Sequence, residues 1–331
     1  MGVALAKAVP PGDGPAAPPP YSSPMRAATH IGVDEAGLGP NLGPLVVVAM
    51  RWEGLLGSTD DLWRTLSAAV TQDREEAGKL LIGDSKLVYR DRRDGATLHA
   101  AADGLLRAAG VEVGSLQDVV VSLDPEAAAD FEAAPWFAGE AAEVSGTVAA
   151  RLDVLSTVLE AEGATLSVAA AVVPAGRFNR LLADSAGKGD LLSRLSLATL
   201  RRVWTPGEPA AVWCDKHGGR NAYAQHLTDV CGGEFVQVLS EGKAESRYAV
   251  GDSRIAFGVR SERHFPVACA SIVAKSVRQR CMAAFNAFWS RHDPGLKPTE
   301  GYPTDAKRFA EETAALRRSL GIADDLFWRS R

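Results

Sequence analysis

The stretch GVDEAGLGPNLGPLVVVAM, residues 32–50, places two adjacent carboxylates directly before a loop rich in glycine and proline. The apolar and β-branched residues on both sides of the loop predict two buried strands that pair as an antiparallel hairpin. Asp34 and Glu35 fit poorly in a buried strand, because a buried carboxylate needs a cation or several hydrogen-bond donors. The stretch therefore leaves two alternatives, a hairpin turn with two surface acids or part of a binding site.

A cofactor-binding loop is a third interpretation of GLGPNLG, residues 37–43. The dinucleotide fingerprint needs a helix directly after the glycines, because the N-terminus of that helix holds the pyrophosphate. Here Pro40 and Pro44 interrupt the loop, and LVVVAM, residues 45–50, continues as a strand. The spacing of the glycines also differs from the fingerprint, so the sequence argues against a dinucleotide cofactor.

A second acid occupies a matching position further along the chain. The run AAVWCDKHGG, residues 210–219, begins with an apolar strand that ends on Asp215, before two glycines. If this strand neighbours the first one in a sheet, Asp34 and Asp215 lie close together at one rim. Clustered carboxylate oxygens are the ligands that Mg²⁺ or Mn²⁺ prefers, and such ions support phosphodiester chemistry. A turn in which the Asp215 side chain bonds the following backbone is the alternative.

Composition and charge restrict the class of protein. The chain has 331 residues, 46% of them hydrophobic and 23% charged, which predicts a soluble globular protein with a sizeable core. A net charge of −5 argues against a protein that coats nucleic acid, but it allows an enzyme with a local basic groove. No apolar run approaches the roughly 18 residues of a membrane span. The cysteines form no CxxC pair, which argues against zinc and disulfides and favours free thiols in the cytoplasm.

Local patterns predict an α/β or α+β protein without internal repeats. Apolar and β-branched runs predict strands over 29–37, 44–52, 164–174, 210–215, 234–242 and 253–260. Amphipathic or alanine-rich runs predict helices over 61–72, up to Gly110, and over 145–163, 190–204, 266–292 and 304–321. Residues 1–27, rich in proline and alanine, predict a disordered tail. Residues 111–150 lack periodicity and predict an insertion, a lid or a partner surface.

Five short blocks, in order along the chain, carry a resemblance to a known family. They are GVDEAGLGPNLGP (32–44), IGDSKLV (82–88), VWCDKHGG (212–219), VACASIVAKSVRQR (267–280) and GYPTDAKRF (301–309). The first is similar to an Asp-Glu-Ala-Gly-Arg-Gly-Pro block, the second to an Asp-Ser-Lys block and the third to a strand that carries a third acid. The fourth is similar to an Ala-Ala-Ala-Ser-Ile-x-Ala-Lys helix, and the last to a Gly-Tyr-x-Thr segment. On these blocks the chain resembles the type 2 ribonucleases H, that is, ribonuclease HII and its relatives.

The resemblance implies a ribonuclease H-like fold. We expect a mixed sheet, antiparallel in its first strands and then parallel, that is flanked by helices and carries inserted helical segments. The catalytic domain would span residues 28–310, with insertions near 51–78 and 111–150, and residues 311–331 would form a C-terminal helix and tail.

The resemblance also implies a two-metal site. Asp34, Glu35 and Asp215 would be the catalytic residues and would hold two Mg²⁺ or Mn²⁺ ions. Consecutive strand residues face opposite sides, so both acids can serve one site only where the strand ends or bulges. Gly37 and Gly39 supply a place for that irregularity.

The chain departs from the family pattern at two positions. Where the helix block of the family has a fourth acid after its Arg, this chain has Gln279, a weaker ligand for a hard cation. Another acid, such as Glu262, is the alternative fourth ligand. The second departure is Leu38, which replaces the Arg of Gly-Arg-Gly, the loop in which the family senses the 2′-hydroxyl of a ribose. That change puts a preference for single embedded ribonucleotides in doubt.

The remaining blocks imply contacts with nucleic acid. The expected nucleic-acid-binding residues are Gly37, Leu38, Gly39, Ser85, Lys86, Lys275, Arg278 and Tyr302. His217 is interpreted as a local turn histidine, because oxygen-rich Mg²⁺ sites seldom include imidazole.

These observations predict a cytoplasmic, metal-dependent endoribonuclease that leaves 3′-hydroxyl and 5′-phosphate ends. Its partners would be an RNA–DNA hybrid or a ribonucleotide-containing duplex, and no membrane. Two alternatives stay open. The first is a catalytically weakened protein of this fold that binds nucleic acid or a protein, and the second is a nuclease of the same fold with another substrate, such as a structured DNA.

Overall fold

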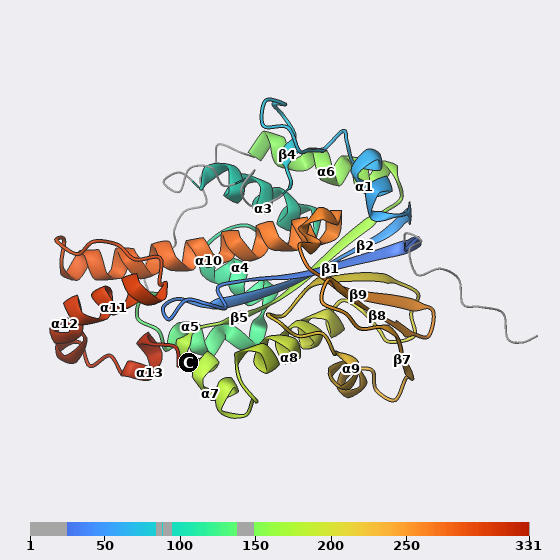
Figure 1. Ribbon diagram of the computed structural model, residues 1–331. Helices are drawn as coiled ribbons and strands as arrows, with labels where there is room; N and C mark the ends of the chain where they lie inside the picture. Colours follow the sequence, from blue (N-terminus) through green and yellow to red (C-terminus); the bar gives the residue numbers. More distant parts are fainter. Residues whose placement is uncertain (1–24, 84–87, 89–94, 138–148, 331) are drawn as a thin grey trace, which may run out of the picture.

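A mixed seven-stranded sheet runs through the centre of the protein in a computed structural model, which describes residues 25–83, 88, 95–137 and 149–330 (Figure 1). The strand order is β5-β2-β1-β6-β9-β8-β7. The bounds are β1 (Ala27–Ala36), β2 (Leu45–Gly57), β5 (Thr165–Val173), β6 (Ala211–Asp215), β7 (Val236–Ser240), β8 (Glu245–Val250) and β9 (Ser253–Gly258). Two short strands, β3 (Val70–Thr71) and β4 (Leu80–Leu81), pair separately.

The direction of the strands confirms the predicted mixed sheet. β1 and β2 pair antiparallel, as do β2 and β5, whereas β6 is parallel to both β1 and β9. The sheet then returns to antiparallel pairing through β8 and β7. The hairpin predicted from residues 32–50 is therefore present, and the strand that ends on Asp215 is its direct neighbour, as expected.

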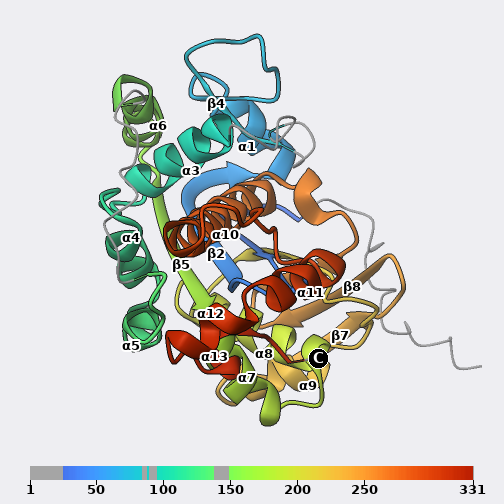
Figure 2. The ribbon, with the colours of Figure 1, turned by 90° about the vertical axis from the view of Figure 1, so that its left-hand side faces the viewer.

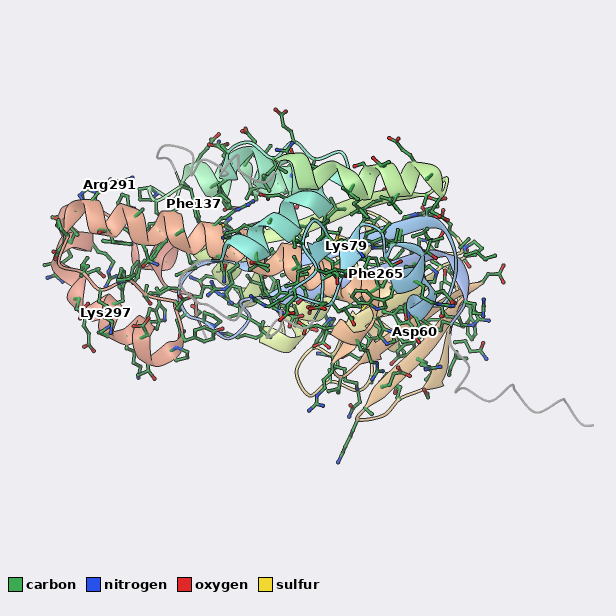
Figure 3. All side chains as sticks on the ribbon, turned by 90° about the horizontal axis from the view of Figure 1, so that it is seen from above. Asp60, Lys79, Phe137, Phe265, Arg291 and Lys297 are labelled. Atoms are coloured by element: carbon green, nitrogen blue, oxygen red, sulfur yellow. The ribbon has the colours of Figure 1, made fainter. Side chains whose placement is uncertain are left out.

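Helices cover both faces of the sheet (Figures 1 and 2). α10 (Phe265–His292) is the longest and lies across one face, where Figure 3 shows it running from Phe265 near the middle of the molecule to Arg291 at one end. On the same side lie α1 (Thr59–Thr65), α3 (Ala96–Ala108), α4 (Leu116–Leu123) and α6 (Ala149–Ala161). The opposite face carries α7 (Ala175–Ala183), α8 (Lys188–Arg201) and α9 (Ala224–Val230).

The remaining elements are short. They are η1 (Pro125–Ala127), α5 (Ala128–Glu132), η3 (Ser261–Arg263), α11 (Pro303–Glu312), α12 (Ala314–Ser319) and α13 (Asp324–Phe327). The last three helices gather at the C-terminal end of α10 (Figure 1). The single helix predicted over 304–321 is observed as two helices, because α11 ends before Thr313 and α12 begins after it.

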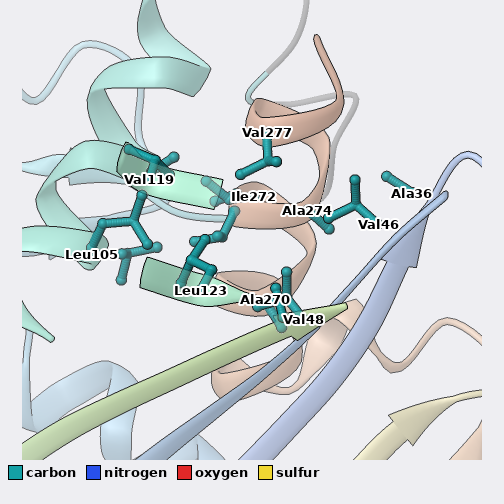
Figure 4. Close-up of a cluster of buried hydrophobic side chains, with 14 of the residues drawn as sticks. Ala36, Val46, Val48, Leu105, Val119, Leu123, Ala270, Ile272, Ala274 and Val277 are labelled. Carbon is teal, nitrogen blue, oxygen red and sulfur yellow. The ribbon is translucent and has the colours of Figure 1, made fainter. Parts of the chain in front are cut away.

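Two hydrophobic cores hold the layers together. The larger core lies between the sheet and α10, where Val46 and Val48 of β2 meet Ala274 and Ala270 of α10 (Figure 4). The second core lies on the other face, between β1, β2, β6 and the helices α7 to α9. Alternation along β1 divides its residues between the two, since Ile31 and Val33 belong to the second core.

Residues 116–137 are built into the larger core. Val119 and Leu123 of α4 are fully buried there, and Phe131 of α5 stacks on Phe137 with ring centroids 4.2 Å apart. This packing gives no support to a lid, although an insertion relative to the family remains a prediction. The predicted tail of residues 1–27 lies outside the described residues as far as residue 24, and β1 begins at Ala27.

All four cysteines are free and buried, as the sequence predicts. Within the described ranges, no helix combines the length and the apolar character that a bilayer crossing requires.

Candidate active site

The candidate site lies where β1 and β6 end beside each other. β1 pairs with β6 only as far as Val33 and Cys214, whereas its pairing with β2 continues to Ala36. Asp34 and Glu35 therefore stand past the last β6 pair, and Asp215 is the last residue of β6. The register of β1 is regular from Thr29 to Ala36, so no bulge brings the two acids together. β1 ends one residue after them, at Ala36.

Asp34 faces α10. Its side chain is 6% exposed and lies near the Ser271 hydroxyl and the Lys275 ammonium of that helix. Burial is the main effect and raises the pKa of Asp34 to about 7; Lys275 and Ser271 oppose that rise, while Asp215 and Glu262 add to it. One of its oxygens, Oδ1, accepts a hydrogen bond from the Glu35 backbone N–H at 2.9 Å.

Glu35, near the end of β1, and Asp215, at the end of β6, are the other two acids at these strand ends. Burial, followed by the charges of Asp34 and Asp215, raises the pKa of Glu35 well above its usual range. Burial also raises the pKa of Asp215, although the Ser261 N–H donates to its Oδ1 at 3.0 Å and opposes that rise. Each carboxylate thus lies in an environment that disfavours its charged form, which a bound cation would reverse.

Glu262 joins the three predicted acids from a different element. It lies in η3, directly before α10, and its Oε1 accepts hydrogen bonds from Ser271 Oγ at 2.7 Å and Lys275 Nζ at 2.5 Å. Its charge acts on both Asp34 and Asp215. The sequence offered Glu262 only as a substitute for a missing acid, because an isolated Glu in a charged turn carries no pattern of its own.

The four acids suit a divalent cation by their chemistry. Carboxylate oxygens are the ligands of Mg²⁺ and Mn²⁺, and Lys275 is a single positive charge among four acids. As the side chains stand, no group of three or more His, Cys, Asp or Glu residues within the described residues is arranged to hold a metal ion. The Lys275 ammonium and the Ser271 hydroxyl instead hold Glu262.

A cavity of about 890 Å³ opens beside these acids. Its lining includes Glu35, Gly37, Lys275 and Arg278, together with apolar side chains of α3 and α10. Tyr302 also lines the cavity and is 59% exposed, so its ring is available to a bound molecule. The lining also includes Gly83 and Val88, so the cavity joins residues from four of the five sequence blocks.

Gln279 lies on the wall of the same cavity, partly buried and close to Gly95 at the start of α3. It shares a cavity with Glu35, but Glu262 is the acid whose charge acts on Asp34 and Asp215. A ligand role for Gln279 stays a prediction, and Glu262 is the better candidate for a fourth ligand.

The loop from Gly37 to Gly43 packs beside the cavity. Gly37 has a φ of +92° and no room for a side chain, because a Cβ there would lie 2.4 Å from Arg278 Nε. Leu38 turns toward the second core, whereas Gly39 is exposed. The Arg278 guanidinium is buried and donates to the carbonyl of Glu300 at 3.1 Å. The phosphate contact expected of Arg278 therefore remains a prediction.

Three further residues singled out in the sequence are Ser85, Lys86 and His217. Ser85 and Lys86 lie outside the described residues. His217 is buried and bonds Ser193 Oγ through Nδ1 at 3.0 Å, and burial lowers the pKa of His217 to about 3. This arrangement agrees with a structural role for that histidine.

Comparisons with known proteins give distant likenesses. No family model matches the chain, and no curated protein matches it. Among solved structures, a chain of the PCNA:RNase HII complex from Archaeoglobus fulgidus is 14% identical, with a TM-score of 0.45, and the match covers 92% of this chain and 94% of that one. Ribonuclease H2 from Pyrococcus horikoshii OT3 is 15% identical, with a TM-score of 0.40, over 90% of this chain and 92% of that one.

A third likeness is Bst-RNase HIII in complex with Mn²⁺, at 19% identity and a TM-score of 0.41. That match covers 91% of this chain but 65% of the other. These likenesses are distant, so the function is inferred from the site itself.

Proposed function

We propose that this protein is a metal-dependent endoribonuclease that hydrolyses the RNA strand of RNA–DNA hybrids, leaving 3′-hydroxyl and 5′-phosphate ends. The observation that carries the proposal is the cluster of Asp34, Glu35 and Asp215 at the ends of β1 and β6, which Glu262 of η3 joins beside a cavity. Asp34 is buried and Glu35 and Asp215 are half-buried, and burial raises the pKa of all three. Acids with raised pKa values concentrate at functional sites.

The four acids would hold the metal ions. Bound Mg²⁺ or Mn²⁺ would supply an activated water and positive charge for the leaving 3′ oxygen of the phosphodiester. The residues of the chain would do the rest. Lys275, on the cavity wall, would meet a substrate phosphate, and Tyr302 would stack against a ribose. Gly37, where no side chain fits, would let the backbone approach the sugar.

One assay tests the proposal. Purified protein is incubated with end-labelled RNA–DNA hybrid, with a duplex that contains one ribonucleotide, and with plain DNA duplex, each with Mg²⁺ or Mn²⁺. The expected result is cleavage of the hybrid, absent in Asp34→Asn and retained in Asp252→Asn, a matched change at the exposed turn before β9. No cleavage above the Asp34→Asn level with either metal would contradict the proposal. Cleavage of the DNA duplex alone would assign another substrate.

Glu262 and Gln279 can be separated by metal dependence. Glu262→Gln is expected to raise the Mn²⁺ concentration for half-maximal cleavage by roughly 10–100-fold, because it removes a charge that acts on Asp34 and Asp215. Gln279→Ala should change that concentration by less than about threefold. Titration of Mn²⁺ at fixed substrate measures both values. A larger effect for Gln279→Ala would return the fourth ligand to the position expected from the family pattern.

A further inference from the structure

Arg329 is a fully buried cation next to the loop from Gly37 to Gly43, which borders the candidate site. Its side chain is fully buried, although it lies in the C-terminal segment after α13. The backbone of this segment runs against the loop from Gly37 to Gly43. The Arg329 N–H donates to the Asn41 carbonyl at 2.8 Å, and Asn41 Nδ2 donates back to the Arg329 carbonyl at 3.2 Å.

The guanidinium of Arg329 donates to the carbonyls of the loop. Nη1 lies 2.5 Å from the Gly37 oxygen, and Nη2 lies 3.1 Å from the Leu38 oxygen. The guanidinium also stacks on the Phe178 ring, with its carbon 3.9 Å from the ring centroid. In the described part of the chain no carboxylate pairs with Arg329, so its guanidinium donates only to backbone oxygens there. Arg278 donates to the Leu42 carbonyl at 3.4 Å from the side of α10.

These two hydrogen bonds fix the direction of two peptide groups. In a trans peptide the carbonyl and the following N–H point in opposite directions. With the Gly37 and Leu38 oxygens held by Arg329, the N–H groups of Leu38 and Gly39 point away from the guanidinium. Neither N–H donates to a protein group among the described residues, and a Cβ at Gly39 would meet nothing within 4 Å. The two donors are therefore free to meet a bound molecule.

We propose that Arg329 is a positioning residue, which orients the Gly37–Leu38 and Leu38–Gly39 peptide groups so that two backbone N–H donors face an oxygen-rich substrate beside Glu35. The inference rests on the proposed function for the identity of that substrate, a ribose or a phosphate of nucleic acid. The fork of an Arg side chain suits this role, since one rigid group reaches two consecutive carbonyls. Leu38 takes the place of an Arg in the family pattern, so the guanidinium at this loop comes from Arg329 instead.

The test compares Arg329→Met with Arg317→Met. Arg317 is a matched control, because its guanidinium also stacks on a phenylalanine, Phe327, at 4.4 Å but reaches no loop carbonyl of residues 37–43. Hydrogen exchange of residues 37–43 and the kcat and KM for a ribonucleotide-containing duplex are measured for both. Exchange of the loop is expected to be at least about tenfold faster in Arg329→Met, with unchanged exchange in β8 and β9. We expect kcat to fall by about tenfold or more, with KM changed by less than about threefold.

Equal loop exchange in the two methionine variants would overturn the proposal, as would equal kcat values. If the wild type cleaves nothing, the proposed function fails, and loop exchange alone still decides whether Arg329 positions the loop. Arg329→Lys keeps the charge without the fork, and intermediate values for both readouts are expected. Should Arg329→Met not fold, the lysine variant decides by the same two measurements.

Discussion

Replacing Asp34 with Asn is expected to make the metal-free protein more stable and, at the same time, to abolish cleavage. Burial raises the pKa of Asp34 from 3.8 to about 7, so the folded state keeps a proton that the unfolded state has lost. The contribution of this group to stability is present below pH 4 and is lost as pH rises toward 7. At pH 8 the wild type should therefore be less stable than the variant, by roughly 1–3 kcal/mol.

Urea denaturation in EDTA at pH 5 and pH 8 measures this difference. The stability of the wild type should fall between the two values by more than that of Asp34→Asn, and Asp252→Asn should follow the wild type. Added Mn²⁺ should raise the melting temperature of the wild type and leave that of Asp34→Asn nearly unchanged, since binding to the folded state stabilises it. Cleavage should fall by roughly 10²–10³-fold or more, as for loss of one group that stabilises charge in the transition state. A variant less stable than the wild type at pH 8 would show that Asp34 is a structural acid.

Gly32→Ala is expected to unfold or strongly destabilise the protein. Gly32 lies on β1 directly beneath the start of α10, and a Cβ there would lie 2.1 Å from the Pro266 carbonyl carbon and 2.4 Å from the Val267 nitrogen. Both are backbone atoms, so no side chain can move aside and the helix itself must shift. The expected loss is about 3 kcal/mol or more in the free energy of unfolding. A shift of α10 also displaces Ser271 and Lys275, which bond Glu262, so cleavage should fall further than stability alone explains.

Gly219→Ala provides the control for this substitution. Gly219 is exposed, and a Cβ there would meet nothing within 4 Å, so a change within about 0.5 kcal/mol is expected. Urea denaturation of both variants at one pH gives the comparison. Equal free energies of unfolding would mean that β1 and α10 do not pack as closely as their backbones indicate.

The sequence predicts the parts of the fold that have a repeating pattern. The hairpin, the strand ending on Asp215 and the long helix from Pro266 were all expected from apolar periodicity, and each is present. β8 was missed because Glu245 and Arg247 alternate with buried residues in a short run that has the charge of a loop. α7 was missed for a similar reason, since it has only nine residues between a strand and a helix.

The candidate site divides in the same way. Asp34 and Asp215 could be placed together because parallel neighbours end at one rim, and that inference needs only the strands. Glu262 and Arg329 have no such pattern, since one lies in a single turn and the other in an irregular segment after the last helix. Their roles depend on which residues of other segments they meet, and only the packed chain determines that.

The strand order has a consequence for how the protein matures. One edge of β1 pairs with β2, and the other edge stays unpaired until β6 has formed. Residues 34 and 215 are separated by more than half of the chain. Pairing over such a distance forms late, because the entropy of closing the intervening chain opposes it. In a nascent or partly folded chain, Asp215 is thus far from Asp34 and Glu35, and all three are in water, where charges repel one another little. The protein would acquire any capacity to cut nucleic acid only as its central strands meet, near the completion of folding.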